Sequence, residues 1–248
     1  MKIAIVGLGR MGSALRSGFA WDARVTNVTG TRSGDDNVRA IDGADVVVLA
    51  VKPHHARTVI EELAPHLGAA LLVSICAGIR LDDLTLWSGG HRRIVRAMTN
   101  TPALVGAAMT VLAPAADLPA ADLELARSLF AGLGQTEILD EALFDAVTAL
   151  SGCGPAYVFS VIEALADGGI ALGIPAKVAR KLAAQTILGS TKLFVEREAE
   201  PAELREEVAT PGGATVAGLH VLEAAKLHQT FVDAVAAAAL RSAELRGK

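Results

Sequence analysis

Apolar residues in the first part of the chain recur in short runs, with helical patterns between several of them. The apolar runs predict strands over residues 2–6, 24–28, 45–51, 70–75, 93–98, 109–112 and 135–139. Helical patterns follow the first run from residue 13 and cover residues 55–67 and 123–133. Repeated alternation of strand and helix predicts an α/β fold with a doubly wound sheet of the Rossmann type.

Strand patterns stop near residue 140, and the remaining chain is helical. The pattern predicts an α/β domain over residues 1–140 and a second, all-helical domain over residues 141–248. The helices expected over residues 155–172 and 176–196 carry Ala, Leu, Ile and Val on more than one face. Because a helix that is apolar on several sides is buried on several sides, we expect a homodimer, with assembly into a larger oligomer of dimers left open.

A glycine-rich turn lies directly between the first strand and its helix. It reads Gly7, Leu8, Gly9, Arg10, Met11 and Gly12. In a dinucleotide-binding turn the first glycine permits the tight bend, the second admits the pyrophosphate and the third lets helix and strand pack closely. The alternative is a purely structural turn, but the position after a strand and before a helix favours dinucleotide binding.

The residues that follow the second expected strand favour NADP(H). A site specific for NAD usually places Asp or Glu there, whereas this chain has Thr31, Arg32 and Ser33. Hydroxyls and a guanidinium suit a 2′-phosphate, although a solvated turn arginine is the alternative. Little room remains for a helix before residue 44, and this short crossover leaves the preference between NADPH and NADH open.

Two further strand ends are expected to line the cofactor. The buried run over residues 45–51 leads into a turn, so backbone contacts are expected from Ala50, Val51, Lys52 and Pro53. The run over residues 70–75 ends at Cys76, Ala77 and Gly78, whose small side chains leave room for a flat ring. We therefore expect Ala77 to contact the cofactor.

Composition and charge exclude several other classes. Aromatic residues make up 4% of the chain and the net charge is -4, which argues against binding of nucleic acid. Cys76 and Cys153 have no disulfide or zinc spacing, and the adjacent His54 and His55 point apart, so no metal is expected. No signal segment and no uninterrupted apolar run of membrane-spanning length is recognised, which predicts a cytoplasmic protein without a membrane partner.

Six motifs, read in order, resemble pyrroline-5-carboxylate reductase from end to end. They are GLGRMG at residues 7–12, AVKP at 50–53, SICAGI at 74–79, RAMTNTP at 96–102, LSGCGPAY at 150–157 and TPGGAT at 210–215. The last two are the most specific. The resemblance implies NAD(P)H-dependent reduction of 1-pyrroline-5-carboxylate to L-proline, the last step of proline biosynthesis, by a dinucleotide-binding domain and a helical substrate and dimerisation domain.

The resemblance also implies roles for residues of the second half. Gly212, Gly213 and Ala214 precede or begin a helix, so their amides and the helix dipole suit the substrate carboxylate. Thr215 matches the residue whose hydroxyl donates to the imine nitrogen, with helix capping as the alternative. Asn37 is expected to contact the adenosine end of the cofactor. Glu141 resembles an acidic residue near the substrate, or is a charge at a helix start.

The chain departs from the family pattern at a few positions, and other functions remain as alternatives. Cys153 and Thr210 stand where Ser is common, and neither change removes needed chemistry. A β-hydroxyacid dehydrogenase needs a Lys in the helix after Pro155, and this helix has none. A reductase of a related cyclic imine acid is a nearer competitor. A non-catalytic NADP(H)-binding sensor would not need the TPGGAT loop.

Overall fold

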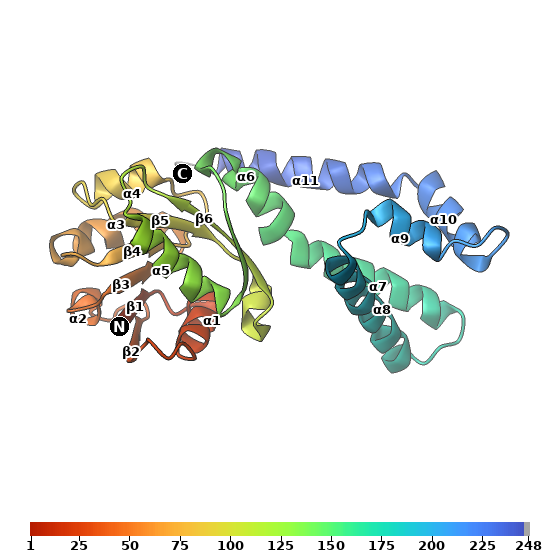
Figure 1. Ribbon diagram of the computed structural model, residues 1–248, viewed down its shortest axis with the longest axis horizontal. Coiled ribbons are helices and arrows are strands. Elements are labelled where there is room, and N and C mark those ends of the chain that lie inside the picture. Colours follow the sequence, from red (N-terminus) through yellow and green to blue (C-terminus); the bar gives the residue numbers. More distant parts are fainter. Residues whose placement is uncertain (246–248) are drawn as a thin grey trace. The chain divides into compact units, whose positions relative to one another are not determined.

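A seven-stranded sheet forms the centre of the first part of the computed structural model, which describes residues 1–245 (Figure 1). Its strands lie in the order β2-β1-β3-β4-β5-β6-β7, and all neighbours are parallel except the antiparallel pair β5–β6. The strands are β1 (Lys2–Val6), β2 (Asn27–Thr31), β3 (Val46–Leu49), β4 (Leu71–Ser74), β5 (Ile94–Met98), β6 (Ala108–Pro114) and β7 (Gly134–Ile138). The predicted doubly wound α/β fold is therefore confirmed.

Helices cover both faces of this sheet (Figure 1). Successive side chains of a strand point to opposite faces. Ile3 and Ile5 accordingly pack with α1 (Arg10–Phe19) and α5 (Ala120–Ala131), where the rings of Phe19 and Phe130 meet edge to face at 5.4 Å. The other face packs against α2 (Asn37–Ile41), α3 (Pro53–Leu63) and its continuation η1 (Ala64–His66), and α4 (Leu81–Trp87).

The second strand lies later in the chain than the sequence pattern predicts. β2 covers Asn27–Thr31, in register with Lys2 to Val6 of β1, so the predicted strand at residues 24–28 is misplaced. The physical reason is a turn before β2, in which the amide of Val25 donates to the carbonyl of Asp22. The crossover that follows contains only the five-residue helix α2, which agrees with the short crossover expected from the sequence.

Contacts divide the chain into two compact units at a position later than residue 140. Unit 1 comprises Met1–Pro155 with the C-terminal segment from Ala236, and unit 2 comprises Ala156–Val235. The short elements after β7 stay with unit 1 because Phe144 and Val147 pack against Val111 of β6. These elements are η3 (Glu141–Leu143), α6 (Phe144–Val147) and the π-helical turn η4 (Thr148–Gly152), and η2 (Thr101–Val105) belongs to the same unit.

Unit 2 consists of helices that bury little of their apolar surface within the chain. Its helices are α7 (Gly154–Ala171), α8 (Ala176–Arg197), α9 (Pro201–Glu207), α10 (Ala214–Ala224) and the first part of α11 (Leu227–Glu244). The buried apolar cluster of this unit is formed by Ala166, Ala179 and Ala183. Large apolar side chains such as Phe159 and Leu188 remain exposed.

One helical run is long and apolar enough to cross a membrane, although charged residues such as Glu163 and Asp167 interrupt it, as expected from the sequence. Within residues 1–245, Glu141–Ala171 is long and apolar enough by length and composition, with a mean hydropathy of 1.3 and 11% of the window buried. Core helices of soluble proteins pass the same test, so this run alone is weak evidence for a membrane span.

Candidate functional site

The glycine-rich turn after β1 is held by two close backbone approaches. Gly7 has a φ of 107°, and a Cβ there would lie 2.7 Å from the backbone of Ala50. A Cβ on Gly12 would lie 2.1 Å from the carbonyl oxygen of Gly7. Both positions therefore require glycine, as expected for the bend and for the packing of helix on strand.

Gly9 is different, because its Cβ position faces open space. No heavy atom of the described residues 1–245 lies within 4 Å of a Cβ built there, and its φ of -74° suits any residue. Gly9 is also the N-cap of α1, and the first amides of a helix have no acceptor within that helix. Open space directly before free amides and a positive dipole end fits a pyrophosphate. The turn therefore suits the cofactor expected from the sequence.

The end of β2 is shaped by backbone hydrogen bonds. Thr31 is buried, and its carbonyl accepts from the amides of Gly7 and Leu8 at 3.2 and 2.7 Å. The amide of Arg32 donates to the Asp35 carboxylate at 2.7 Å, and the Asp35 amide donates back to the Arg32 carbonyl at 3.1 Å. Thr31 thus helps to form the turn, while the exposed Arg32 and Ser33 follow in a fixed bend.

The short helix α2 presents the expected adenosine ligand. Asp36 is its N-cap and accepts from the amide of Arg39 at 2.9 Å. Asn37 is the first helical residue, and its side-chain amide donates to Glu62 of α3 at 3.3 Å. The side-chain amide is therefore oriented by α3, and its oxygen accepts no hydrogen bond from residues 1–245.

The strand ends of β3 and β4 meet at a buried thiol. The Sγ of Cys76 lies 3.6 Å from the carbonyl of Leu49 and 3.3 Å from that of Val51. Burial raises the pKa of this thiol to about 11, against the smaller lowering effect of its hydrogen bonds with Ser74 and Val51. Cys76 is therefore a neutral packing residue that joins the two strand ends, and the next residue, Ala77, is exposed.

α3 begins at Pro53, two residues before the start of the helix predicted over residues 55–67. Lys52 is the N-cap and Pro53 the first helical residue, and both are exposed. The ring centroids of His54 and His55 lie 4.2 Å apart, so the expectation that these adjacent side chains point apart is wrong. Among residues 1–245, no group of three or more His, Cys, Asp and Glu side chains is arranged to hold a metal ion.

In unit 2, the loop before α10 is a tight turn. Gly212 has a φ of 70°, the Gly213 amide donates to the Thr210 carbonyl at 2.9 Å, and a Cβ on Gly213 would lie 2.5 Å from the Thr210 hydroxyl. Gly213 is the N-cap of α10, which has no side-chain cap hydrogen bond, so Thr215 does not cap the helix. Thr215 is exposed in the first turn, next to Ala214.

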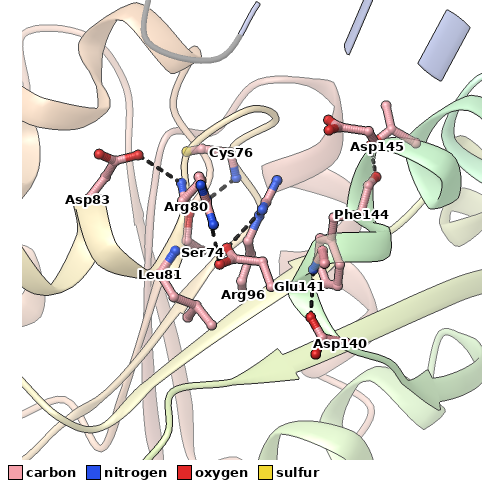
Figure 2. Close-up of polar contacts among 12 residues, drawn as sticks. Ser74, Cys76, Arg80, Leu81, Asp83, Arg96, Asp140, Glu141, Phe144 and Asp145 are labelled. Atoms are coloured by element: carbon pink, nitrogen blue, oxygen red, sulfur yellow. Dashed lines mark hydrogen bonds and ion pairs between the residues drawn. The ribbon is translucent and has the colours of Figure 1, made fainter. Parts of the chain in front are cut away.

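Glu141 holds a network inside unit 1 (Figure 2). Its Oε1 accepts from the amide of Leu81 and from the Arg96 guanidinium, both at 2.8 Å. Its Oε2 lies 3.9 Å from Arg80. The Arg96 guanidinium also lies 4.6 Å from the centre of the Phe144 ring. The carboxylate that was expected near the substrate is thus engaged by protein groups.

The sequence analysis gave no role to three residues that shape unit 1, although two of them, Arg96 and Asn100, lie in the motif at residues 96–102. Arg96 is 6% exposed in its side chain, and a charged residue inside an apolar strand was the signal for it. Asn100 joins β5 to η4, because its amide donates to Ser151 at 3.2 Å and its oxygen accepts from Met109 at 3.1 Å. Asp35 fixes the Arg32 bend and had no signal beyond its place in a polar turn.

Comparisons with known proteins match almost the whole chain. Residues 141–245 match the family model described as pyrroline-5-carboxylate reductase dimerisation, and residues 27–78 match the one described as NADP oxidoreductase, coenzyme F420-dependent. A pyrroline-5-carboxylate reductase of Pisum sativum is 45% identical over 88% of this chain and 79% of its own length. One from Methanosarcina acetivorans is 38% identical over 100% of this chain and 98% of its own.

A solved structure agrees with these matches. The crystal structure of Plasmodium falciparum pyrroline carboxylate reductase with NADP bound has a TM-score of 0.91 and is 32% identical. The alignment covers 98% of this chain and 97% of that one.

Proposed function

The chain belongs to the pyrroline-5-carboxylate reductase family, and from that premise we propose how its residues reduce 1-pyrroline-5-carboxylate to L-proline with NADPH. It is an NADP(H)-dependent oxidoreductase with a Rossmann-type first half. The match to the Methanosarcina acetivorans reductase along 100% of the chain is the observation that carries the reaction.

Unit 1 provides the residues for the cofactor. The turn from Gly7 to Gly12 binds the pyrophosphate through the amides at the start of α1, with Gly9 leaving the space for it. Arg32, Ser33 and Asn37 bind the adenosine end and its 2′-phosphate. Ala50 to Pro53 and Ala77 contact the cofactor along the strand ends. When bound, the reduced nicotinamide supplies the hydride to the imine carbon.

The loop before α10 provides the residues for the substrate. The amides of Gly212, Gly213 and Ala214 bind the substrate carboxylate, and the dipole of the 11-residue helix α10 favours that negative charge. The Thr215 hydroxyl donates a hydrogen bond to the imine nitrogen, whose basicity rises as the hydride arrives. Its exposure and its lack of a capping role support this assignment.

Two finer assignments complete the proposal. The chain forms a homodimer through its helical half, in keeping with the dimerisation model that matches residues 141–245. It acts in the cytoplasm, where its two cysteines stay reduced; they are free thiols in the structure.

The test is NADPH oxidation with 1-pyrroline-5-carboxylate, measured for the native chain, Thr215→Ala and Thr215→Ser. Loss of the hydroxyl should lower kcat by about tenfold or more. Thr215→Ser keeps the hydroxyl and should retain most of the turnover, and NADPH affinity should be unchanged in both variants. Full turnover in Thr215→Ala would remove its assigned role.

Parallel assays define the substrate and the cofactor. We expect faster turnover of the five-membered imine acid than of its six-membered homologue, and lower KM for NADPH than for NADH. Preference for the larger ring would instead favour the alternative function as a reductase of a related cyclic imine acid. NADPH binding without turnover of either substrate would favour a sensor.

A further inference from the structure

The loop from Ala77 to Leu81 connects β4 to α4, and its position follows from the sheet order. The chain crosses from β2 on one side of β1 to β3 on the other, so the switch point lies beside β1. With the pyrophosphate at the turn after β1 and the adenosine end beside β2, the nicotinamide half extends past the carboxyl ends of β3 and β4. This placement rests on the function proposed above.

The loop has one exposed residue between buried anchors. Cys76 and Ile79 are buried, whereas Ala77 between them is exposed, and Gly78 adopts a φ of 77°. A residue with a positive φ reverses the chain locally and turns Ala77 outward. The conformation of Ala77 therefore depends on how the two ends of the loop are fixed.

Glu141 fixes the far end of this loop from a distant part of the chain. Its Oε1 accepts from the Leu81 amide, the first residue of α4, while the same oxygen accepts from Arg96 of β5 (Figure 2). Both side chains are largely buried, 14% exposed for Glu141 and 6% for Arg96. The Phe144 ring packs against the guanidinium and keeps Arg96 in place.

We infer that Glu141 is a positioning residue: by joining the Leu81 amide to the buried Arg96, it holds the Ala77–Leu81 loop in the conformation that receives the nicotinamide half of NADPH. Its carboxylate therefore acts on the cofactor through the loop and does not bind the substrate. A hydrogen bond to a charged group inside a partly buried site is strong enough to fix such a loop.

The experiment compares two ligands by calorimetry, NADPH and 2′-phospho-ADP-ribose, which lacks the nicotinamide. Glu141→Ala removes both hydrogen bonds and should weaken NADPH binding by roughly tenfold, while binding of 2′-phospho-ADP-ribose stays unchanged. Glu141→Gln keeps an oxygen that accepts from Leu81 and Arg96, and should bind NADPH within about twofold of the native chain. Asp140→Ala is the matched control, since the neighbouring Asp140 carboxylate accepts from the Ala142 amide instead of from the Leu81 amide.

Three results would overturn the inference. Equal weakening of both ligands indicates a general structural role. An increased KM for the imine acid with unchanged NADPH affinity indicates a substrate ligand. Unchanged affinity for NADPH in Glu141→Ala indicates no role for the loop. A native chain that binds no NADPH would overturn the proposed function as well, and this failure is recognised because no substitution is involved.

A second variant tests the inference if Glu141→Ala does not fold. Glu141→Ala leaves the buried Arg96 without its partner, so its fold is checked by circular dichroism. If it does not fold, the double variant Arg96→Met with Glu141→Leu removes both charges together. The same selective weakening of NADPH over 2′-phospho-ADP-ribose is expected, and equal binding of both ligands as in the native chain would overturn the inference.

Discussion

At the scale of single residues, the glycines of one turn perform different tasks. Gly12 has backbone in the place where a Cβ would be, 2.1 Å away, so it is required by the fold. Gly9 has open space there and an ordinary φ of -74°, so the fold alone does not require it. A glycine that the fold does not require, placed at the start of a helix, is explained by a ligand that approaches its backbone.

This difference gives a prediction for Gly9→Ala. The new methyl group would occupy the space proposed for the pyrophosphate, so NADPH affinity should fall by about tenfold or more. The free energy of unfolding should change by only about 0.5 kcal/mol, because the backbone conformation suits alanine. Calorimetric titration with NADPH and thermal unfolding measure the two quantities.

Gly12→Ala provides the matched comparison in the same turn. Its methyl group would overlap the Gly7 carbonyl, so the free energy of unfolding should fall by about 3 kcal/mol or more. A Gly9→Ala variant that binds NADPH as tightly as the native chain would contradict the placement of the pyrophosphate. A Gly12→Ala variant of unchanged stability would contradict the packing of α1 on β1.

At the scale of secondary structure, elements with sharp signals at both ends were predicted well. β1 has the predicted bounds because regular apolar alternation ends at the glycine turn. β2 was misplaced because its sequence, NVTGT, is weakly apolar, and its position is set by pairing with β1. The pairing of separate strands leaves no local signal in a sequence, so the register of β2 with β1 could not be predicted from the sequence alone.

The residues of the candidate site likewise divide into those with a local sequence signal and those that come together only in the fold. The glycine turn and the TPGGAT loop are contiguous motifs, so the sequence alone identified them. The pair Arg96 and Glu141 is 45 residues apart and joins only through the fold. The resemblance predicts Glu141 near the substrate, with a charge at a helix start as the alternative. In the structure its carboxylate accepts hydrogen bonds from Arg96 and from the Leu81 amide.

The short helix α2 allows a prediction at this scale. Asp36→Ala removes the N-cap, which costs about 1 kcal/mol and loosens the first turn that carries Asn37. If Asn37 contacts the adenosine end, the Kd for NADPH should rise by up to about fivefold. Calorimetry with NADPH measures this change.

Asp42→Ala is the control for that variant. Asp42 follows the same helix and accepts from the Lys2 side chain through its backbone carbonyl, which the substitution keeps. NADPH affinity should therefore remain at the native level. An equal loss of affinity in both variants would argue against a specific role for the start of α2.

At the scale of the whole molecule, the helical half has more apolar surface than its own core can bury. The buried apolar cluster of unit 2 consists of three alanines, while larger apolar side chains on α7, α8 and α10 stay exposed. Exposed apolar surface of this extent is typical of a surface that binds another molecule. In the proposed homodimer, burial against a second copy would also cover the apolar run Glu141–Ala171.

A single charged substitution tests this account of the dimer. Leu188 of α8 is 60% exposed, and its burial against a second copy is worth about 2 kcal/mol per side chain. In a symmetric dimer the loss occurs twice, so Leu188→Glu should weaken association on the order of a hundredfold or more. Ser190→Glu places the same charge at an exposed polar position of the same helix, about 200° around the helix axis from Leu188, and should leave association intact.

Sedimentation at micromolar concentration should show dimers for the native chain and for Ser190→Glu, and monomers for Leu188→Glu. A native chain that sediments as a monomer would contradict the explanation, since the exposed apolar surface would then have no second copy to cover it.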